Sequence, residues 1–198
     1  MNDRAKIYQT PSGIAEDPWL ATPDTRFDPR GHHKVTLRLS TDNAQPLITL
    51  VDDAMVASLA QAKKECPSRA KTIKATADKP YRTALDPYGS VTEDVLFRFG
   101  SLAKPTSKRT GETRINRPEL FDAKAKPLDP TKTNIGDGAT IKIAFEMRPF
   151  YIPFLGAGVV LRLRAVQVLN RVELAHWDAE AYGFVEEEGY DANESLKG

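Results

Sequence analysis

The fold is decided by the stretch "ATIKIAFEMRPFYIPFLGAGVVLRLRAVQVL", residues 139–169. Its first third alternates Ile141, Ile143 and Phe145 with polar or small residues, which is the period of a half-buried strand. Its last third alternates as well, but the apolar phase inverts at Val166. A strand that changes its inward face is bent or bulged, as happens where one strand serves both ends of a small barrel.

The segments around this stretch predict further strands and one helix. Residues 34–40 and 95–102 alternate apolar and polar side chains, so each predicts a strand. Residues 47–66 carry apolar side chains at helical spacing behind Pro46 and predict one amphipathic helix. Residues 67–94 alternate basic and Pro/Gly-rich pieces, which is typical of a long surface excursion. We therefore expect a mainly β protein: a small β-barrel with one amphipathic α-helix and long loops.

The two ends of the chain differ in composition from its centre. Residues 1–33 show no sustained period and predict an extended N-terminal arm. Residues 173–198 hold eight of the 27 acidic residues and one of the 28 basic residues, so a basic body precedes an acidic end. We expect one binding domain over residues 1–176 and an acidic tail over residues 177–198. A basic body attracts a polyanion, whereas an acidic tail contacts basic surfaces or simply keeps the protein in solution.

Several classes of function find no support in the sequence. The longest apolar run, "GAGVVL", is too short to span a bilayer, so no membrane partner is expected. The single cysteine, Cys66, and the polar start of the chain point to a reducing cytosol. No nucleotide-binding loop or catalytic motif is present, and His32, His33 and His176 lack the spacing of a metal site, so His32 and His33 are expected to be a surface pair. We expect no catalytic residue, no metal and no cofactor.

Cations occupy the polar face of the predicted strands, and aromatic residues lie in the adjoining loops. The cations opposite or just beyond the apolar phase are Lys34, Arg38, Arg98, Lys142, Arg148, Arg162 and Arg164. The rings in polar segments that contain proline or glycine are Tyr81, Tyr88, Phe150 and Tyr151, and the cations beside Tyr81 are Lys79 and Arg82. A flat ring next to a positive charge suits the stacking of a base and the neutralisation of its phosphate. The pattern indicates single-stranded nucleic acid as the partner.

The ordered set of segments resembles the T7-type phage single-stranded DNA-binding proteins. The similar segments are "SGIAEDPWLATPDTRFDPRGHHKVTLRL", "ELFDAKAKPL", "GDGATIKIAFEMRPFYIPFLGAGVVLRLRAVQVLNRVEL" and the acidic "YGFVEEEGYDA". The resemblance implies an OB-fold, binding of single-stranded DNA without sequence preference, and an acidic tail that contacts replication proteins. Arg30, Lys142 and Phe150 align with family residues that contact DNA. Two features depart from the family: the tail ends in "NESLKG", and residues 67–94 have no counterpart.

These inferences combine into one expected function. We expect a protein that coats single-stranded DNA in phage DNA replication, recombination and repair, in the cytoplasm of the infected bacterial host. The expected DNA-binding residues are Trp19, Arg30, Lys34, Lys79, Tyr81, Arg82, Tyr88, Arg98, Lys142, Arg148, Phe150 and Tyr151. The resemblance implies a phage DNA polymerase or helicase as the partner of the tail, and it leaves a homodimer open. The tail residues expected to contact that partner are Glu186, Glu187, Glu188 and Asp191.

Two alternative functions stay open from the sequence. In the first, the body is a replisome scaffold whose tail recruits basic enzymes and whose contact with DNA is incidental. In the second, the barrel binds RNA or tolerates duplex DNA, because stacking and phosphate contacts do not by themselves reject a 2′-hydroxyl.

Overall fold

The structure is a computed structural model, and it describes residues 6–107, 109–130, 132–133, 135–172, 183, 185 and 187–188. Two of the four predicted tail contacts, Glu186 and Asp191, lie outside the described residues, as does most of the predicted tail. Glu187 and Glu188 are described and exposed. No described helix combines the length and the apolar character that a membrane crossing requires.

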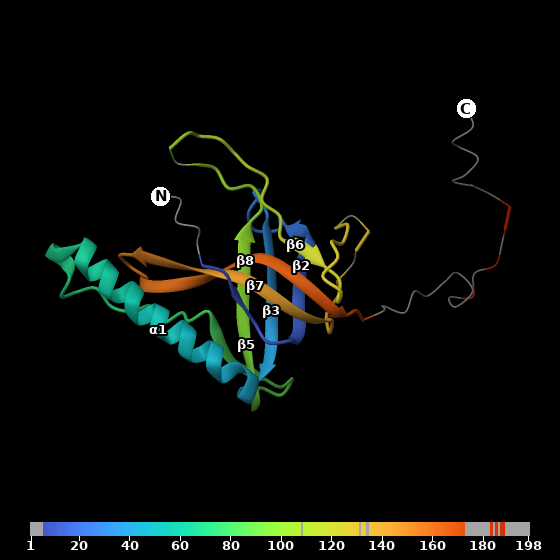
Figure 1. Ribbon diagram of the computed structural model, residues 1–198, viewed down its shortest axis with the longest axis horizontal. Helices are drawn as coiled ribbons and strands as arrows, with labels where there is room; N and C mark the ends of the chain where they lie inside the picture. Colours follow the sequence, from blue (N-terminus) through green and yellow to red (C-terminus); the bar gives the residue numbers. More distant parts are fainter. Residues whose placement is uncertain are drawn as a thin grey trace.

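The described chain forms an eight-stranded sheet and one long helix (Figure 1). The strands follow the order β1-β7-β2-β3-β5-β8-β6, and β7 also pairs with β8, so the sheet curls back on itself. A short strand, β4, pairs with the outer part of β5. This arrangement confirms the expected mainly β fold. The strands are β1 (Tyr8–Gln9), β2 (Gly13–Asp24), β3 (His32–Ser40), β4 (Tyr81–Leu85), β5 (Val91–Leu102), β6 (Glu119–Phe121), β7 (Thr140–Ile152) and β8 (Gly156–Asn170).

The phase change in the last strand is a β-bulge. Ala144 of β7 lies opposite Ala165 of β8, whereas the next residue, Phe145, lies opposite Leu163, so that Arg164 is the extra residue. An extra residue moves the following side chains to the other face, which is why Leu163 and Val166 are both buried. The inversion predicted from the sequence is confirmed.

The core lies inside the curled sheet, where the predicted inward residues meet. Phe97 and Phe99 of β5 and Phe145 of β7 are almost completely buried. The rings of Phe99 and Phe145 meet edge to face, with centroids 5.2 Å apart, an arrangement that adds to the free energy gained from area burial. Because the apolar positions of β3, β5 and β7 all point inward, their polar positions form one outer surface.

The helix α1 (Thr41–Glu65) begins earlier than predicted. The prediction of residues 47–66 took Pro46 as a signal of the first turn, but Pro46 lies inside the helix, one turn further on. Its ring is exposed, and the buried positions of α1 follow a helical stripe: Ala44, Leu47, Val51, Met55, Ser58 and Ala62. This stripe packs along the β7–β8 hairpin, which projects beyond the barrel beside α1 (Figure 1).

The prediction of an extended arm over residues 1–33 is wrong, because strands make up most of its described part, residues 6–33. Residues 13–24 form β2, which pairs with β3 and buries Ala15 and Leu20. The register slips between Glu16 and Trp19, and Asp17 between them has a φ of 46°. This irregularity breaks the two-residue period, so the sequence pattern conceals the strand.

The predicted surface excursion over residues 67–94 is only partly a loop. After a short 3-10 turn, Pro67–Arg69, the chain folds back onto the tip of the hairpin, where Ile73 is buried and Ala75 bridges to Ala157. Residues 81–85 then form β4 on the edge of β5. The segment therefore joins the tip of α1 to the outer surface of the sheet.

Candidate nucleic-acid interface

One row of residues crosses the outer surface of five strands. Trp19 of β2 pairs with Lys34 of β3, Lys34 with Gly100 of β5, Gly100 with Arg162 of β8, and Arg162 with Glu146 of β7. Residues paired across strands lie on the same side of a sheet, so these five form one line about 19 Å long at the usual strand spacing. We call the surface around this line the sheet face.

A groove of about 630 Å³ runs along the sheet face beside the hairpin. Gly100 lies in its floor, and a Cβ atom built there would stay 3.5 Å from the nearest atom, so the missing side chain leaves the floor open. Phe150 and Val160 of the hairpin form one wall, and Arg98 lies on the other side. The groove is therefore mostly apolar, with one cation, Arg98, and its partner Asp78 at the border, which suits a base with its attached phosphate.

The predicted ring Phe150 is seated by a glycine on the neighbouring strand. Phe150 lies opposite Gly158, and a Cβ atom on Gly158 would come within 2.9 Å of the Phe150 ring. The ring therefore occupies space that only glycine leaves free. Ser58 of α1 fixes the same point, because its hydroxyl donates to the Gly158 carbonyl at 2.8 Å. Phe150 is half-buried and lines the groove.

Three arginines of the hairpin surround one buried carboxylate. The Glu146 side chain is 5% exposed and lies 2.7 Å from Arg148, 3.5 Å from Arg164 and 3.9 Å from Arg162. Arg148 also donates from Nε to Glu146 at 2.8 Å. Three positive charges against one negative charge leave this cluster net positive. Because the carboxylate is fixed by burial, it holds the guanidinium groups in place on the sheet face.

At the other end of the row, Trp19 lies among two acids and two cations. Lys34 Nζ is 3.0 Å from a carboxylate oxygen of Asp17 and 3.0 Å from one of Asp24. The indole N–H of Trp19 donates to Asp17 at 2.8 Å, and the Arg26 guanidinium lies 4.7 Å from the ring centroid. Hydrogen bonds from Arg26 hold the pKa of Asp24 well below its usual range, and bonds to both acids raise the pKa of Lys34. These groups therefore stay ionised at neutral pH.

Arg98 is held at the rim of the groove by the segment before β4. Its guanidinium donates to Asp78 at 2.5 Å and to the carbonyl oxygen of Lys79 at 2.8 Å. Arg82 lies with Arg98 around a neighbouring hollow of about 420 Å³. The structure thus brings these two predicted cations together.

Tyr81 and Lys79 join β4 to the helix. The Tyr81 hydroxyl and Lys79 Nζ both donate to Asp52 of α1, at 2.8 and 2.9 Å, and the Tyr81 ring packs 5.5 Å from Phe97. Burial raises the pKa of Tyr81. The Asp52 carboxylate therefore anchors β4 to the helix. Tyr81 is half-buried, so less of its ring is available to a ligand than a surface loop would offer.

Four predicted residues lie outside the groove, the row with its arginine cluster, and the hollow beside Arg82. Tyr151 packs on the other side of the hairpin, against Ala62 and the residues around it. Tyr88 is 94% exposed in the turn between β4 and β5, at the opposite end of β5 from Gly100. Lys142 borders a separate hollow of about 230 Å³. Arg30 lies in the loop between β2 and β3, where it pairs with Asp28 at 2.8 Å.

The expected surface pair of histidines is wrong for one of its members. His32 is exposed, but His33 is 2% exposed and points into the barrel. Its ring Nδ1 lies 3.2 Å from the Trp19 carbonyl oxygen, which can only accept, so this nitrogen donates the bond. Burial lowers the pKa of His33, and the ring is a neutral support beneath Trp19.

The sequence interpretation missed Gly100 and Glu146 as parts of the site. Gly100 stands at an outward position of the predicted strand over residues 95–102, where every other outward residue carries a side chain. Glu146 interrupts an otherwise basic face. Each break in the pattern was a signal, because a gap and a counter-charge are what an ordered cationic groove needs.

The profile of the family of single-stranded DNA-binding proteins of bacteriophage T7 matches residues 13–171. The chain belongs to this family. Its members are DNA-binding proteins, not enzymes. The match covers every strand of the sheet face, from β2 to β8.

Solved structures agree with this membership. The crystal structure of gp2.5, the single-stranded DNA-binding protein of bacteriophage T7, is 25% identical, has a TM-score of 0.72, and the match covers 96% of this chain and 100% of that one. The match confirms the OB-like fold. The single-stranded DNA-binding protein of bacteriophage Enc34 is 11% identical, has a TM-score of 0.56, and the match covers 90% of each chain. Its complex with single-stranded DNA is 12% identical, has a TM-score of 0.58, and the match covers 84% of this chain and 88% of that one. The comparison with curated proteins gives no match.

Proposed function

We propose that the protein binds single-stranded DNA on the sheet face, without sequence preference, and coats it during phage DNA replication, recombination and repair. The observation that carries the proposal is the row from Trp19 to Glu146. In this row Gly100, in the floor of the apolar groove, lies between Lys34 on one side and the arginines around Glu146 on the other. Membership of the family supports the same partner.

In the proposed complex, bases and phosphates meet different groups. Bases stack on the flat faces of Phe150 and Trp19, at the two ends of the sheet face, and lie over the gap at Gly100 between them. Phosphates meet Lys34, Arg98 and the arginines around Glu146. None of these groups reads the edge of a base, so the binding has no sequence preference.

The carboxylates on the sheet face have a physical consequence for binding. The described cations of the row and its rim are already paired with acids, Lys34 with Asp17 and Asp24, and Arg98 with Asp78. A phosphate must therefore share or replace an internal partner. The gain in free energy per contact is smaller than for a free cation, but the cations need little reordering, because their positions are set before DNA arrives.

The proposal extends to the tail and the location. The tail residues Glu186, Glu187, Glu188 and Asp191 are proposed to contact a basic surface of a phage DNA polymerase or helicase in the cytoplasm of the infected bacterium. The split between a basic body and an acidic end supports this contact. A homodimer is a further proposal. Removal of residues 178–198 should leave DNA binding equal or tighter, because an internal competitor is gone, and should abolish co-sedimentation with the replication enzyme.

The test of DNA binding is a titration of labelled oligo-dT, followed by fluorescence anisotropy at two salt concentrations. Between about 50 and about 200 mM salt the affinity should fall with a log–log slope near 0.7 per phosphate contact. An affinity that stays flat would overturn the proposal. Competition with RNA and duplex DNA of matched sequence measures selectivity, and equal competition by RNA would support the RNA-tolerant alternative instead.

Gly100→Val is the variant that tests the groove itself. A valine in the open floor fits the strand, because the nearest atom to a Cβ is 3.5 Å away, and it blocks the groove without any change of charge. We expect binding to weaken about tenfold, the free energy of one lost stacking contact. Gly136→Val is the matched control, since a Cβ there meets nothing within 4 Å and Gly136 lies in a turn away from the groove.

A further inference from the structure

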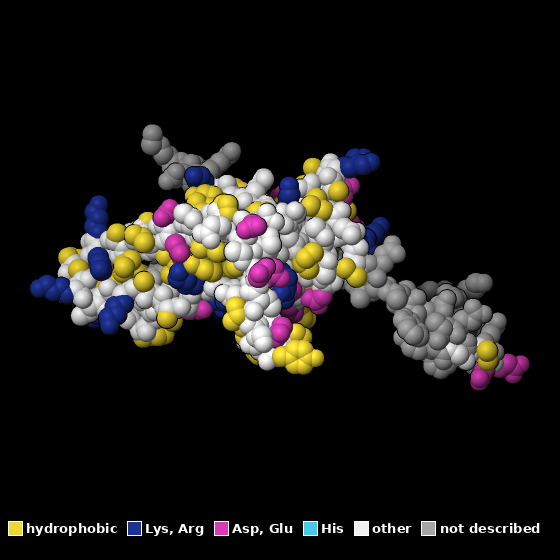
Figure 2. All heavy atoms as spheres, turned by 90° about the horizontal axis from the view of Figure 1, so that it is seen from below, with side chains coloured by type: hydrophobic (Ala, Val, Ile, Leu, Met, Phe, Trp, Pro, Cys, Tyr) yellow, Lys and Arg dark blue, Asp and Glu magenta, His cyan; other side chains and the backbone are white. Residues whose placement is uncertain are grey.

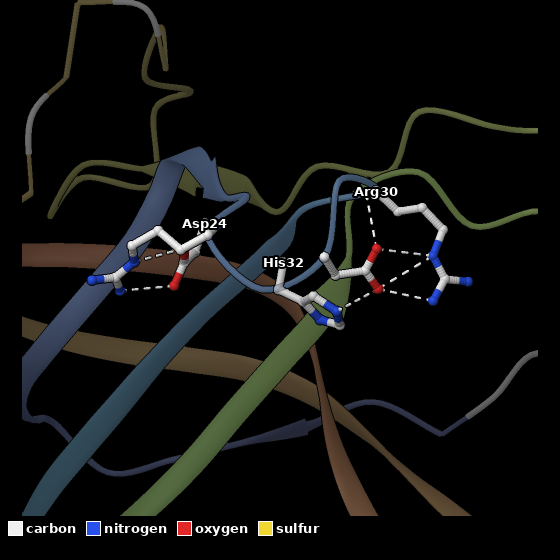
Figure 3. Close-up of polar contacts among 5 residues, drawn as sticks. Asp24, Arg30 and His32 are labelled. Carbon is white, nitrogen blue, oxygen red and sulfur yellow. Dashed lines mark hydrogen bonds and ion pairs between the residues drawn. The ribbon is translucent and has the colours of Figure 1, made fainter.

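The loop between β2 and β3 contains the same short motif twice. In "DTRFDPR", residues 24–30, Asp24 is followed two residues later by Arg26, and Asp28 by Arg30. The Oδ1 atom of Asp24 accepts from the backbone N–H and Nε of Arg26, at 3.0 and 2.9 Å, and Oδ2 accepts from Nη2 at 2.8 Å. Asp28 binds Arg30 in the same way, at 2.9, 3.1 and 2.8 Å (Figure 3). We call this segment the Asp-x-Arg loop.

The two Asp–Arg pairs, which we call the forks, fix the backbone on both sides of Phe27. In each fork the carboxylate binds both the backbone N–H and the guanidinium of the arginine two residues later. These charged hydrogen bonds hold the pKa of each aspartate well below its usual range. After the second fork the Gly31 N–H donates to the Asp28 carbonyl oxygen at 2.8 Å, with Gly31 at a φ of 71°. Phe27 therefore stands at the centre of an ordered loop.

Phe27 itself is not needed for packing. Its side chain is 91% exposed, so it contributes little to the hydrophobic core. Yet its ring continues the sheet face, because the Arg26 guanidinium is close to both rings, 4.7 Å from the centroid of Trp19 and 5.8 Å from that of Phe27. A solvent-facing ring on a fixed backbone, next to a cation, has the features of a stacking platform.

We propose that Phe27 is a base-stacking residue, which extends the path of single-stranded DNA beyond Trp19 onto the Asp-x-Arg loop. A base stacks on the exposed ring, and the phosphates beside it meet Arg26 and Arg30. This inference rests on the proposed function of the sheet face. It adds a binding position that the sequence interpretation did not include, where only Arg30 of the loop was expected to contact DNA.

The charges around the loop favour DNA over a protein as the occupant. Arg26 and Arg30 donate to the aspartates of the loop while more than half of each arginine side chain stays exposed, and Lys34 Nζ lies 6.0 Å from the Trp19 ring centroid. The exposed ring is isolated between polar residues, whereas an apolar partner surface would need a broader patch. A nucleotide supplies the two matching surfaces, one flat and one anionic.

Substitutions at residue 27 separate stacking from simple apolar contact. Phe27→Leu keeps an apolar side chain but removes the flat face, and Phe27→Trp enlarges the face. We expect Phe27→Leu and Phe27→Ala to weaken binding of oligo-dT of about 16 nucleotides by about 5- to 20-fold, and Phe27→Trp to bind at least as tightly as the wild type. Thermal unfolding should not change, because the ring is exposed. Val56→Ala, which removes another exposed apolar side chain, on α1, is the matched control.

The length of the oligonucleotide tests whether the Phe27 contact lies beyond the groove. With oligo-dT of about 6 nucleotides, too short to fill the groove and the loop together, the loss in Phe27→Leu should be smaller. Equal affinity of Phe27→Leu and wild type for the longer oligonucleotide would overturn the inference, as would equal losses in Phe27→Leu and Val56→Ala. These outcomes differ from failure of the proposed function, in which the wild-type protein itself would bind neither oligonucleotide.

Discussion

Two basic regions of the molecule hold their charges in different ways. On the sheet face the cations are paired, and Glu146 alone lies within 4 Å of three arginines. At the far end of α1, residues 63–74 contain five exposed cations and one acid, Glu65. Within the described part of the chain, none of these five cations forms an ion pair. Figure 2 shows Lys and Arg side chains gathered at this left-hand end. We call the five the tip cations: Lys63, Lys64, Arg69, Lys71 and Lys74.

The difference separates two tasks of a DNA-binding surface. A paired cation has a fixed position but a weak distant field, because its partner cancels much of the charge within a Debye length of about 8–10 Å. An unpaired cation has no fixed position, yet its field reaches further and attracts a polyanion before contact. We therefore expect the sheet face to control how long DNA stays bound, and the tip cations to control how fast it arrives.

Loss of the two rings on the sheet face should have the largest effect. Trp19→Leu and Phe150→Leu keep apolar side chains but remove the flat faces, and each should cost about 1–3 kcal/mol of binding free energy. The two residues lie at opposite ends of the face, so the losses should add in the double variant, to about 2–6 kcal/mol. Stopped-flow measurement should assign the loss to a faster dissociation rate.

A loss of affinity through slower association in the double variant would contradict the assignment of dissociation to the sheet face. It would also do so if one ring alone accounted for the whole loss. Thermal unfolding of each variant is the control, because Trp19 also supports Arg26 and Phe150 packs on Gly158.

Neutralising the tip cations should have a smaller effect on DNA binding, and it should act on the association rate. Lys63→Gln, Lys71→Gln and Lys74→Gln together remove three unpaired charges from exposed positions. We expect the association rate at low salt to fall about three- to tenfold, with little change in dissociation. At high salt the variant and the wild type should converge, since screening removes the field of both. A loss that persists at high salt would instead make the tip a direct contact surface.

The sequence pattern predicts which face of a strand points to the core better than it predicts which residues that strand contacts. The alternation around Ile141 and Val35 shows which side of β7 and β3 faces the core, and so which cations face outward. The bulge at Arg164 is visible as well, because it inverts the phase of a strand with strong apolar residues. The corresponding irregularity at Asp17 is not visible, since β2 is short of apolar residues and contains two prolines. The strand then has the appearance of a loop.

The groove and the acids that hold the cations depend on pairings between distant segments. Asp78 is 20 residues from Arg98, and Lys34 pairs with acids inside the segment that the sequence presented as an arm. The row across the sheet needs the register of four strand pairs at once. No local pattern contains that register, so Gly100 could not be recognised as the floor of a groove. The isolated ring of Phe27 was missed because its suitability for stacking depends on the two Asp–Arg pairs that fix the backbone around it.

The smallest expected effect tests the role of the paired acids directly. Asp78→Asn removes the partner of Arg98 at the rim of the groove, where the two side chains are 64% and 53% exposed. An exposed pair of this kind contributes about 0–1 kcal/mol to folding, so the protein should remain stable. DNA binding should tighten about two- to threefold, because a phosphate no longer competes with an internal carboxylate. Fluorescence anisotropy at low salt is the measurement.

The control for this last variant separates local competition from net charge. Asp53→Asn removes one exposed carboxylate from α1, away from the groove, and changes the net charge equally. If both variants tighten binding equally, the acids of the sheet face act only through the total charge. If Asp78→Asn weakens binding, Asp78 holds Arg98 in the orientation that DNA requires, and the free energy of preorganisation exceeds that of competition. Tighter binding in Asp78→Asn alone would show that pairing restrains the sheet face, which leaves unpaired cations elsewhere to attract the DNA.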